Sequence, residues 1–359
     1  MSGEIPGRAE LGNVVVGVDG SPSARTAVLW AAAEADRRGR RLHLVHAADT
    51  DRRALFADAQ TIQDVREAGR DLLTRTTLLV AERFPDLDVT RELGRQEPVS
   101  GLRAAAGARG TIVVGHRGLG GFATLMLGSV GLEVVARAEV PVIVVRGEPP
   151  NPGEGPGSVT AAVRGVADLD WLLLAAAEAE ARKAALRIVS VWNVLTHVGS
   201  VATMLDDLDG IARRRVRETQ ALAERVRRLH PGLSVAHHVE TGTSSAGILV
   251  EASSGTDLIV MGRGRRPLGL GHSLGRVAHT LIHHAHCPVE IVPPGFAARR
   301  TTGVEAGDGG ADGADGAGQS GDDGGADRDG RGGEDGGADV GGRDDEGGEG
   351  HPPTAPGTH

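Results

Sequence analysis

Short apolar runs alternate with longer amphipathic or alanine-rich segments along most of the chain. In the first 147 residues, five runs rich in valine, isoleucine and leucine have the length of strands. Strands are predicted at 13–18 (NVVVGV), 41–47 (RLHLVHA), 87–94 (LDVTRELG), 111–115 (TIVVG) and 141–146 (PVIVVR). Helices are predicted between them at about 23–38, 62–83, 98–108 and 129–137. Nearly continuous apolar strands that alternate with helices are typical of a parallel sheet covered on both faces.

The same pattern then occurs a second time. The segment AAAEA is found at 31–35 and again 144 residues later at 175–179. TIVVG at 111 resembles LIVMG at 258, and VPVIVV at 140 resembles CPVEIV at 287, each 147 residues apart. A repeat of this length indicates two copies of one domain. The predicted fold class is therefore α/β, with two tandem doubly wound domains, each with a five-stranded parallel sheet.

Composition divides the chain further. We expect a flexible N-terminus at 1–10, domains at 11–147 and 158–295, a Pro/Gly-rich linker at 148–157, and a tail at 296–359. The tail is predicted to be disordered, because Gly, Asp and Ala offer almost nothing to bury. From 301 to 359 there are 15 acidic residues and 3 arginines, which leaves 36 basic and 33 acidic residues elsewhere.

A nearly neutral body with 2% aromatic residues makes nucleic acid an unlikely partner. No apolar run approaches the roughly 18 residues of a membrane span, and the first residues do not resemble a signal peptide. Cys287 is the single cysteine, so no internal disulfide can form. These features predict a cytoplasmic protein without a membrane partner.

A glycine-rich loop follows the fourth strand of the first copy. The segment VVGHRGLGGFATLMLGSV covers residues 113–130 and leads into a predicted helix. Open α/β sheets bind ligands at the carboxyl ends of their strands. Gly115 and Gly118 would let backbone amides approach a phosphate, and Gly128 with Ser129 would open a helix whose first amides attract an anion. Asp19, after the first strand, would accept a hydrogen bond from a ribose hydroxyl.

The spacing G-x2-G-x9-G-[ST] after a strand, with VGVD at strand one and VHA at strand two, resembles the universal stress protein family in its ATP-binding subtype. The resemblance covers about residues 11–295 as a tandem pair. It implies a Rossmann-like domain of the adenine nucleotide alpha hydrolase type, with adenine held by backbone groups of strands two and four. The nucleotide contacts it implies are Asp19, Ala47, Val114, Gly115, Gly118, Gly128, Ser129 and Val130.

The second copy departs from this motif. Gly118 and Ser129 correspond to Arg265 and Arg276, and no aspartate occupies the place of Asp19. We expect a degenerate second site, although the two arginines could bind another anion or remain solvated. The resemblance also implies pairing of the two last strands, 141–146 and 288–293, within one chain as an intramolecular pseudo-dimer. A homodimer remains open, and Glu290 is interpreted as marking an exposed face.

Two further clusters have alternative interpretations. His279, His283, His284 and His286 precede Cys287, and the first two have a zinc-binding spacing. A third ligand is missing, so exposed imidazoles at a helix C-terminus are preferred and no metal site is predicted. The segment RGRRPLGLGH at 263–272 could contact RNA, an acidic partner or the tail. His116 could contact a phosphate or be solvated.

The resulting hypothesis is an ATP-binding universal stress protein, a stress-response regulator with little or no turnover. The loop does not distinguish ATP from another adenine nucleotide, and magnesium could accompany the phosphates. One alternative is a slow ATPase or a cyclic-nucleotide-binding protein. Another is an interaction protein with an empty pocket. The chain lacks the SGG-x-DS loop of related pyrophosphatases, since VDGSPSA stands there. A regulatory protein partner is expected but unknown.

Overall fold

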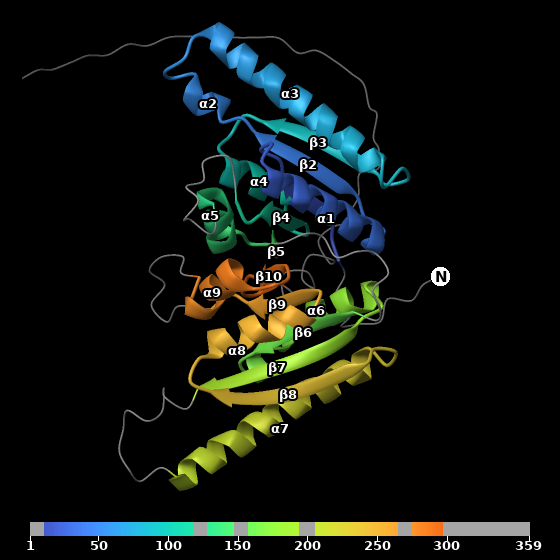
Figure 1. Ribbon diagram of the computed structural model, residues 1–359, viewed down its shortest axis with the longest axis vertical. Helices are drawn as coiled ribbons and strands as arrows, with labels where there is room; N and C mark the ends of the chain where they lie inside the picture. Colours follow the sequence, from blue (N-terminus) through green and yellow to red (C-terminus); the bar gives the residue numbers. More distant parts are fainter. Residues whose placement is uncertain (1–10, 118–127, 147–156, 194–204, 265–273, 297–359) are drawn as a thin grey trace, which may run out of the picture. The chain divides into compact units, whose positions relative to one another are not determined.

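The computed structural model describes residues 11–117, 128–146, 157–193, 205–264 and 274–296 (Figure 1). The predictions for the N-terminus, Gly118, Arg265, the acidic tail and most of the linker lie outside these residues.

Residues 11–146 contain five strands and five helices among the described residues. The strands are β1 (Val14–Gly17), β2 (Leu42–Ala47), β3 (Val89–Gly94), β4 (Thr111–Gly115) and β5 (Val142–Val145). The helices are α1 (Pro22–Arg38), α2 (Thr50–Arg53), α3 (Ala59–Ala81), α4 (Pro98–Ala106) and α5 (Ser129–Arg137). All predicted elements are present. The short helix α2 was not predicted, because four residues carry no helical period.

Residues 157–296 repeat the arrangement. The strands are β6 (Ser158–Val163), β7 (Ala185–Asn193), β8 (Val235–Gly242), β9 (Leu258–Gly262) and β10 (Val289–Val292). The helices are α6 (Leu169–Ala181), α7 (Leu205–Leu229), α8 (Ser245–Ala252) and α9 (Arg276–His284), with 3-10 turns at Val166–Asp168 and Ser253–Gly255. We refer to residues 11–146 as the first half and to residues 157–296 as the second half.

Local sequence explains where α1 begins and ends. The Ser21 hydroxyl accepts a hydrogen bond from the Ala24 amide at 3.1 Å, and Pro22 occupies the first helical position. Gly39 ends the helix with φ of +60°, and its amide donates to carbonyls of the last turn. Only four residues separate the end of β1 from the start of α1, so the intervening loop is short.

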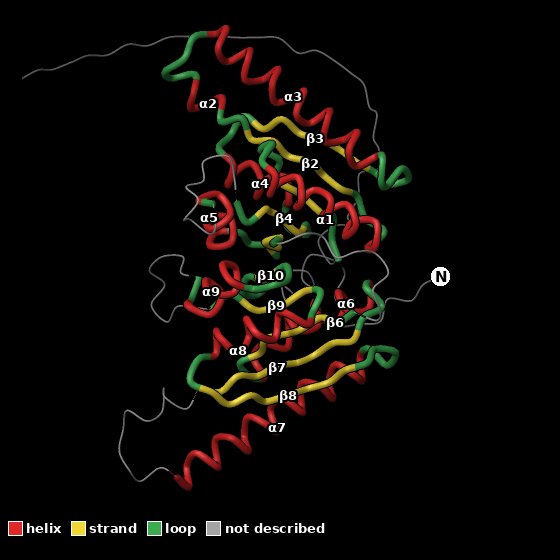
Figure 2. Tube along the Cα trace, in the orientation of Figure 1, coloured by secondary structure: helices red, strands yellow, loops and turns green. Residues whose placement is uncertain are grey.

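The ten strands form one sheet in the order β3-β2-β1-β4-β5-β10-β9-β6-β7-β8 (Figure 2). Strand pairs within each half are parallel, whereas β5 and β10 are antiparallel where the halves meet. The predicted α/β class, with two five-stranded doubly wound units in tandem, is confirmed. The last strands of the two halves, β5 and β10, are neighbours in this sheet.

Helices cover the sheet on both faces. In the first half α1 packs beside α3, and α4 packs beside α5; in the second half α6 packs beside α7, and α8 beside α9. The right-handed crossover rule puts each pair on its own face, because the strand order reverses direction after β3 and again after β8. The core between these layers is built from valine, leucine, isoleucine and alanine, with three tryptophans at its margin.

The interpretation of Glu290 as a mark of an exposed face is wrong. Glu290 is 0% exposed and pairs with Ile143 in the β5–β10 register. Strand β10 lies in the centre of the ten-stranded sheet, so helices cover both of its faces. A single charged residue in an apolar run therefore lies inside the molecule here.

Candidate functional site

The carboxyl ends of β1, β2 and β4 lie next to one another at one edge of the first half. Strand β1 pairs in parallel with β2 on one side and with β4 on the other. The chain leaves β1 toward β2 and leaves β4 toward β5, so the connections diverge between them. Open α/β sheets bind ligands at such a point, because the diverging loops leave a crevice. We call this the carboxyl edge of the first half.

Asp19 lies in the turn between β1 and α1 at this edge. Its Oδ1 accepts the Ser21 amide at 2.9 Å, and Gly20 between them has φ of +85°. The Val18 amide donates to the Val45 carbonyl at 2.8 Å, which continues the pairing with β2. The turn thus fixes the carboxylate through one oxygen and leaves the other oxygen to accept a further hydrogen bond.

Gly115, the last residue of β4, is held by packing against α1. A Cβ at this position would lie 2.6 Å from the Ser23 Oγ and 2.7 Å from the Ser23 backbone carbonyl group. Only glycine lets the two backbones approach this closely. Sequence reasoning connected this glycine with a ligand; the structure shows a packing requirement that holds whether or not a ligand binds.

Ser23 also organises the residues that follow β4. Its hydroxyl accepts the Arg117 amide at 3.1 Å and lies 3.1 Å from His116 Nδ1. Burial, Arg146 and Arg117 lower the pKa of His116, so the imidazole is neutral near pH 7. The Ser23 Oγ and the His116 Nδ1 share a hydrogen bond whose direction depends on the tautomer of the imidazole.

The N-terminus of α5 meets the same edge. Its N-cap is Gly128, which has no side chain to cap the helix, and the Gly128 amide donates to the His116 carbonyl at 3.1 Å. The amides of Ser129, Val130 and Gly131 lie in the first turn, where a helix offers no internal acceptors. The first turn also contains no acidic residue. An anion is the partner that these amides and the helix dipole favour.

The structure therefore gathers most of the predicted residues at one edge. Val114 is buried and can offer only its backbone, Ala47 is half-buried, and Ser129 is exposed. The predicted residues at the carboxyl edge are Asp19, Ala47, Val114, Gly115, Gly128, Ser129 and Val130. Gly118 lies outside the described residues.

Sequence reasoning missed two residues at this edge, Ser23 and Arg146. Arg146 follows β5 directly, and Gly115 pairs with Val145 in the β4–β5 register, so Arg146 lies beside His116. A search for charged residues at the carboxyl end of each predicted strand would have found it, since the predicted strand 141–146 ends at Arg146. The position of Ser23 against Gly115 has no sequence signal, because 92 residues separate them.

The corresponding edge of the second half differs in its chemistry. Val14 pairs with Thr111 and Val159 pairs with Leu258, so Arg164 occupies the place of Asp19. The Arg164 guanidinium forms an ion pair with Asp168 at 2.9 Å.

Two tryptophan side chains take up space at the corresponding edge of the second half. A Cβ on Gly262 would lie 2.5 Å from the Trp171 Nε1, and Trp192, also buried, stands at the end of β7. The indoles occupy space that small residues leave in the first half, where Ala47 and Ala48 end β2.

In the part of the chain that the structure describes, no three histidine, cysteine or carboxylate side chains come together to hold a metal ion. The His279 and His283 rings lie 4.3 Å apart between centroids, inclined at 41°. The described helices also include none with the length and apolar character of a membrane span.

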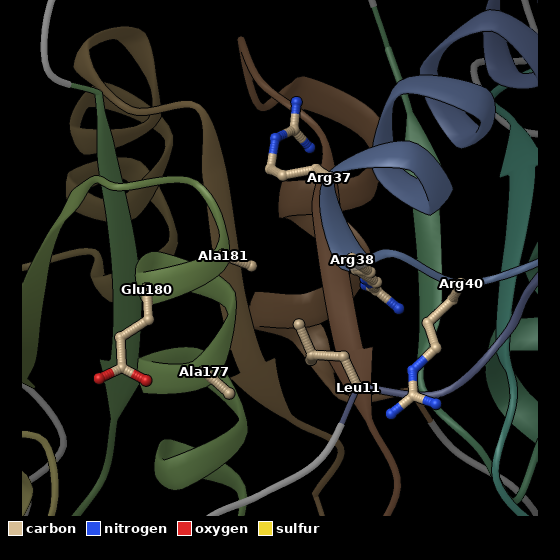
Figure 3. A pocket seen from close by; sticks show the side chains of 7 residues that line it. All are labelled: Leu11, Arg37, Arg38, Arg40, Ala177, Glu180 and Ala181. Carbon is tan, nitrogen blue, oxygen red and sulfur yellow. The ribbon is translucent and has the colours of Figure 1, made fainter. Parts of the chain in front are cut away.

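A cavity of about 320 Å³ lies between α1 and α6, where the two halves meet (Figure 3). Its polar lining includes Arg37, Arg38 and Arg40, but Arg37 and Arg40 extend in opposite directions. The Arg38 guanidinium is engaged with Glu34, Glu178 and Thr111. Because the three arginines do not converge, we assign no ligand to this cavity.

Comparison with known proteins gives the family. The model of the universal stress protein family matches residues 10–146 and again residues 161–293. The chain belongs to the universal stress protein family. Two matches in one chain agree with the two halves of the sheet.

Several universal stress proteins resemble this chain. One from Mycolicibacterium smegmatis is 38% identical over 133 residues, which is 37% of this chain and 45% of that relative. Universal stress protein Rv2624c of Mycobacterium tuberculosis is 29% identical over 298 residues, 81% of this chain and 99% of the relative. The crystal structure of a universal stress protein from Archaeoglobus fulgidus covers 78% of this chain and 98% of its own, with 15% identity and a TM-score of 0.57. The last likeness concerns the fold alone.

Proposed function

We propose that the first half binds an adenine nucleotide, ATP in the first instance, and that the protein acts as a nucleotide-dependent regulator with little turnover. The observation that carries the proposal is the N-terminus of α5. It has a glycine N-cap, no acidic residue in its first turn, and a position at the point where the strand connections diverge. A phosphate group fits these amides and this dipole. The family to which the chain belongs fits the same ligand class.

The roles of the residues follow from where each lies. The amides of Ser129, Val130 and Gly131 would bind a phosphate, and the Ser129 hydroxyl would add a donor. Asp19 would accept a ribose hydroxyl through its second oxygen. Backbone groups of Ala47 and Val114, at the ends of β2 and β4, would hold the adenine. A magnesium ion would arrive with the phosphate chain.

The second half would serve as a structural partner with no nucleotide of its own. Arg164 and Arg276 stand where the first half has Asp19 and Ser129. Trp171 and Trp192 reduce the space beside them. Pairing of β5 with β10 would make the two halves one functional unit, an intramolecular pseudo-dimer.

The test is to count nucleotides per chain by mass spectrometry of the denatured protein and by calorimetric titration. Wild type is expected to bind about one adenine nucleotide. Ser129→Glu should lower affinity at least about tenfold, because a carboxylate in the first turn repels phosphate although it favours the helix dipole. Arg276→Glu, at the equivalent position of the second half, is the matched control and should leave one nucleotide bound.

Either of two results would contradict the proposal: absence of nucleotide from wild type, or equal effects of the two substitutions. Phosphate release from bound ATP, measured in the same samples, separates a regulator from a slow ATPase. Turnover well below one per minute is expected, since a hydrolase needs a positioned base or metal for its water.

A further inference from the structure

Four cationic or titratable side chains lie close to one another where β4 and β5 end, and one of them comes from the second half. We call His116, Arg117, Arg146 and His283 the interface cluster. The Gly128 amide bonds to the His116 carbonyl, and the His116 amide bonds to the Val145 carbonyl, both at 3.1 Å. Arg146 follows Val145 directly, so a continuous series of backbone hydrogen bonds leads from the α5 N-cap to Arg146.

Arg146 connects this series of contacts with the second half. Its guanidinium donates to the Ile282 carbonyl in the last turn of α9 at 2.9 Å. His283 is the next residue, and its ring stacks against His279. The antiparallel pairing of β5 with β10 brings this end of α9 to the carboxyl edge of the first half, because β10 begins where β5 ends. The second half thus contributes side chains beside the proposed phosphate site.

The cluster lacks negative partners. Within the described ranges neither Arg117 nor Arg146 forms an ion pair with a carboxylate, and the His283 Nε2 is buried without a hydrogen-bond partner. Burial and Arg117 lower the pKa of Arg146, and burial, His279, His284 and Arg146 lower the pKa of His283. The exposed Arg117 and the half-buried Arg146, with no carboxylate partner among the described residues, leave a positive potential that a polyanion would neutralise.

We propose that the interface cluster binds the outer phosphates of the nucleotide, so that the ligand is a nucleoside di- or triphosphate recognised jointly by both halves. This inference rests on the proposed nucleotide site of the first half. The α5 N-terminus supplies donors for one phosphate group. A monophosphate or a cyclic monophosphate would end there, whereas a longer chain would reach the guanidinium groups of Arg117 and Arg146, which suit phosphate oxygens.

The experiment measures dissociation constants for ATP, ADP, AMP, cyclic AMP and pyrophosphate with the full chain. We expect ATP and ADP to bind at least about tenfold more tightly than AMP or cyclic AMP. Arg117→Gln should weaken ATP binding at least about fivefold and change AMP binding less than about twofold. Arg117 is exposed and bonds to the Ser23 hydroxyl through its backbone amide, so this variant keeps the fold.

Arg146→Gln, like Arg117→Gln, should weaken ATP binding more than AMP binding, and Arg137→Gln is its control. Arg137 lies at the other end of α5 and pairs with Glu133 at the surface. Since Arg146 also caps α9, its variant is judged by the ratio of ATP to AMP affinity, which a general loss of folding would leave unchanged.

His283→Asn tests the contribution of the second half, with exposed His286→Asn as the control. A bound polyanion favours protonated imidazole, so ATP affinity of the wild type should rise as pH falls from 8 to 6. His283→Asn should lose at least about half of that rise, and His286→Asn should keep it. The protonation of ATP itself is common to all variants and cancels in the comparison.

The outcomes separate the two proposals. Equal affinity for ATP and AMP, or equal effects of Arg117→Gln on both, overturns the interface cluster and leaves the nucleotide site intact. Binding of pyrophosphate without any nucleotide overturns both, since the cluster would then be an independent anion site. Absence of binding for every nucleotide refutes the proposed function together with this inference.

Discussion

Glu290 is a carboxylic acid in the middle of a sheet. Both of its oxygens are buried without a hydrogen-bond partner among the described residues. Burial, and then Glu178, raise the pKa of Glu290 to about 8, although Arg38 and Arg182 oppose this. In the folded protein the group therefore holds a proton at neutral pH, which an unfolded chain would have released.

This raised pKa predicts a pH-dependent stability. Between about pH 4.5 and pH 8 the folded state binds one proton more than the unfolded state, so the free energy of unfolding falls as pH rises by up to about 1.4 kcal/mol per unit. Glu290→Gln cannot ionise and should be more stable than wild type at pH 8, with a smaller difference at pH 5. Urea denaturation of both proteins between pH 5 and pH 8 measures their free energies of unfolding. Parallel curves for the two proteins would contradict the assignment of a proton to Glu290.

At the scale of elements, α5 and α1 are positioned by contacts that join distant parts of the chain. The Arg263 guanidinium, from the second half, donates to the carbonyls of Val135, Ala136 and Ala138 at 2.8–2.9 Å and so caps the C-terminus of α5. At the other face, Gly115 lets β4 touch the start of α1. The start of α1, and the end of α5 opposite the proposed site, are thus held by contacts with distant segments of the chain.

Gly115→Ala should destabilise the protein by about 2 kcal/mol, because the new methyl group meets backbone atoms of Ser23 that cannot move aside. Gly210→Ala is the matched control. Gly210 lies in α7 with nothing within 4 Å of an added Cβ, so alanine should stabilise by about 0.5–1 kcal/mol. Thermal unfolding of both variants is the measurement, and a neutral Gly115→Ala would show that glycine there serves the ligand rather than the packing.

At the scale of the whole molecule, a closed ring of buried charges joins the two halves. Arg38 bonds to Glu34 at 2.7 Å and to Glu178 at 2.5 Å, and Arg182 bonds to Glu34 at 2.6 Å and also to Glu178. The four residues stand at equivalent places of the repeat, 144 positions apart. They are almost fully buried between α1 and α6.

The pKa values of the two carboxyl groups in the ring are shifted in opposite directions. Burial would raise the pKa of Glu34, but Arg182, Arg38 and Arg37 together hold it well below its usual range. Glu178 interacts with Arg38 and Arg182, but burial and the neighbouring Glu34 raise its pKa. The two equivalent carboxyl groups therefore shift in opposite directions because they act on each other as well as on the arginines.

Breaking the ring from one side should separate the two halves. Arg182→Met leaves two buried carboxylates with too little positive charge and should cost about 3–5 kcal/mol of stability. The double variant Arg182→Met/Glu178→Gln should be less destabilised, because it removes charges of both signs and keeps the Glu34–Arg38 pair. Arg41→Gln, which breaks an exposed pair with Asp88, should cost less than about 1 kcal/mol.

Chemical denaturation of these variants, followed by tryptophan fluorescence, gives the comparison. A loss for Arg182→Met as small as that for Arg41→Gln would show that the strand pairing, rather than the charge ring, holds the halves together.

Much of the fold could be predicted because its signals are local. The apolar run of β4 and the Ser21-Pro22 start of α1 each specify an element from neighbouring residues. The G-x2-G-x9-G-[ST] spacing likewise pointed to the carboxyl edge. Glu290 was misjudged because its burial depends on the pairing of β10 with β5, whose Ile143 lies more than 100 residues earlier in the chain.

The sequence by itself determined the repeated α/β units, the edge at which their loops meet, and the replacement of Ser129 by Arg276 in the second copy. These follow from periodicity and spacing along the chain. Tertiary structure alone decided that Glu290 is buried, that Gly115 is required by Ser23, and that α9 brings His283 beside Arg146. Each of these depends on the antiparallel joining of β5 to β10 or on a contact between distant segments, and the order of residues does not encode such distances locally.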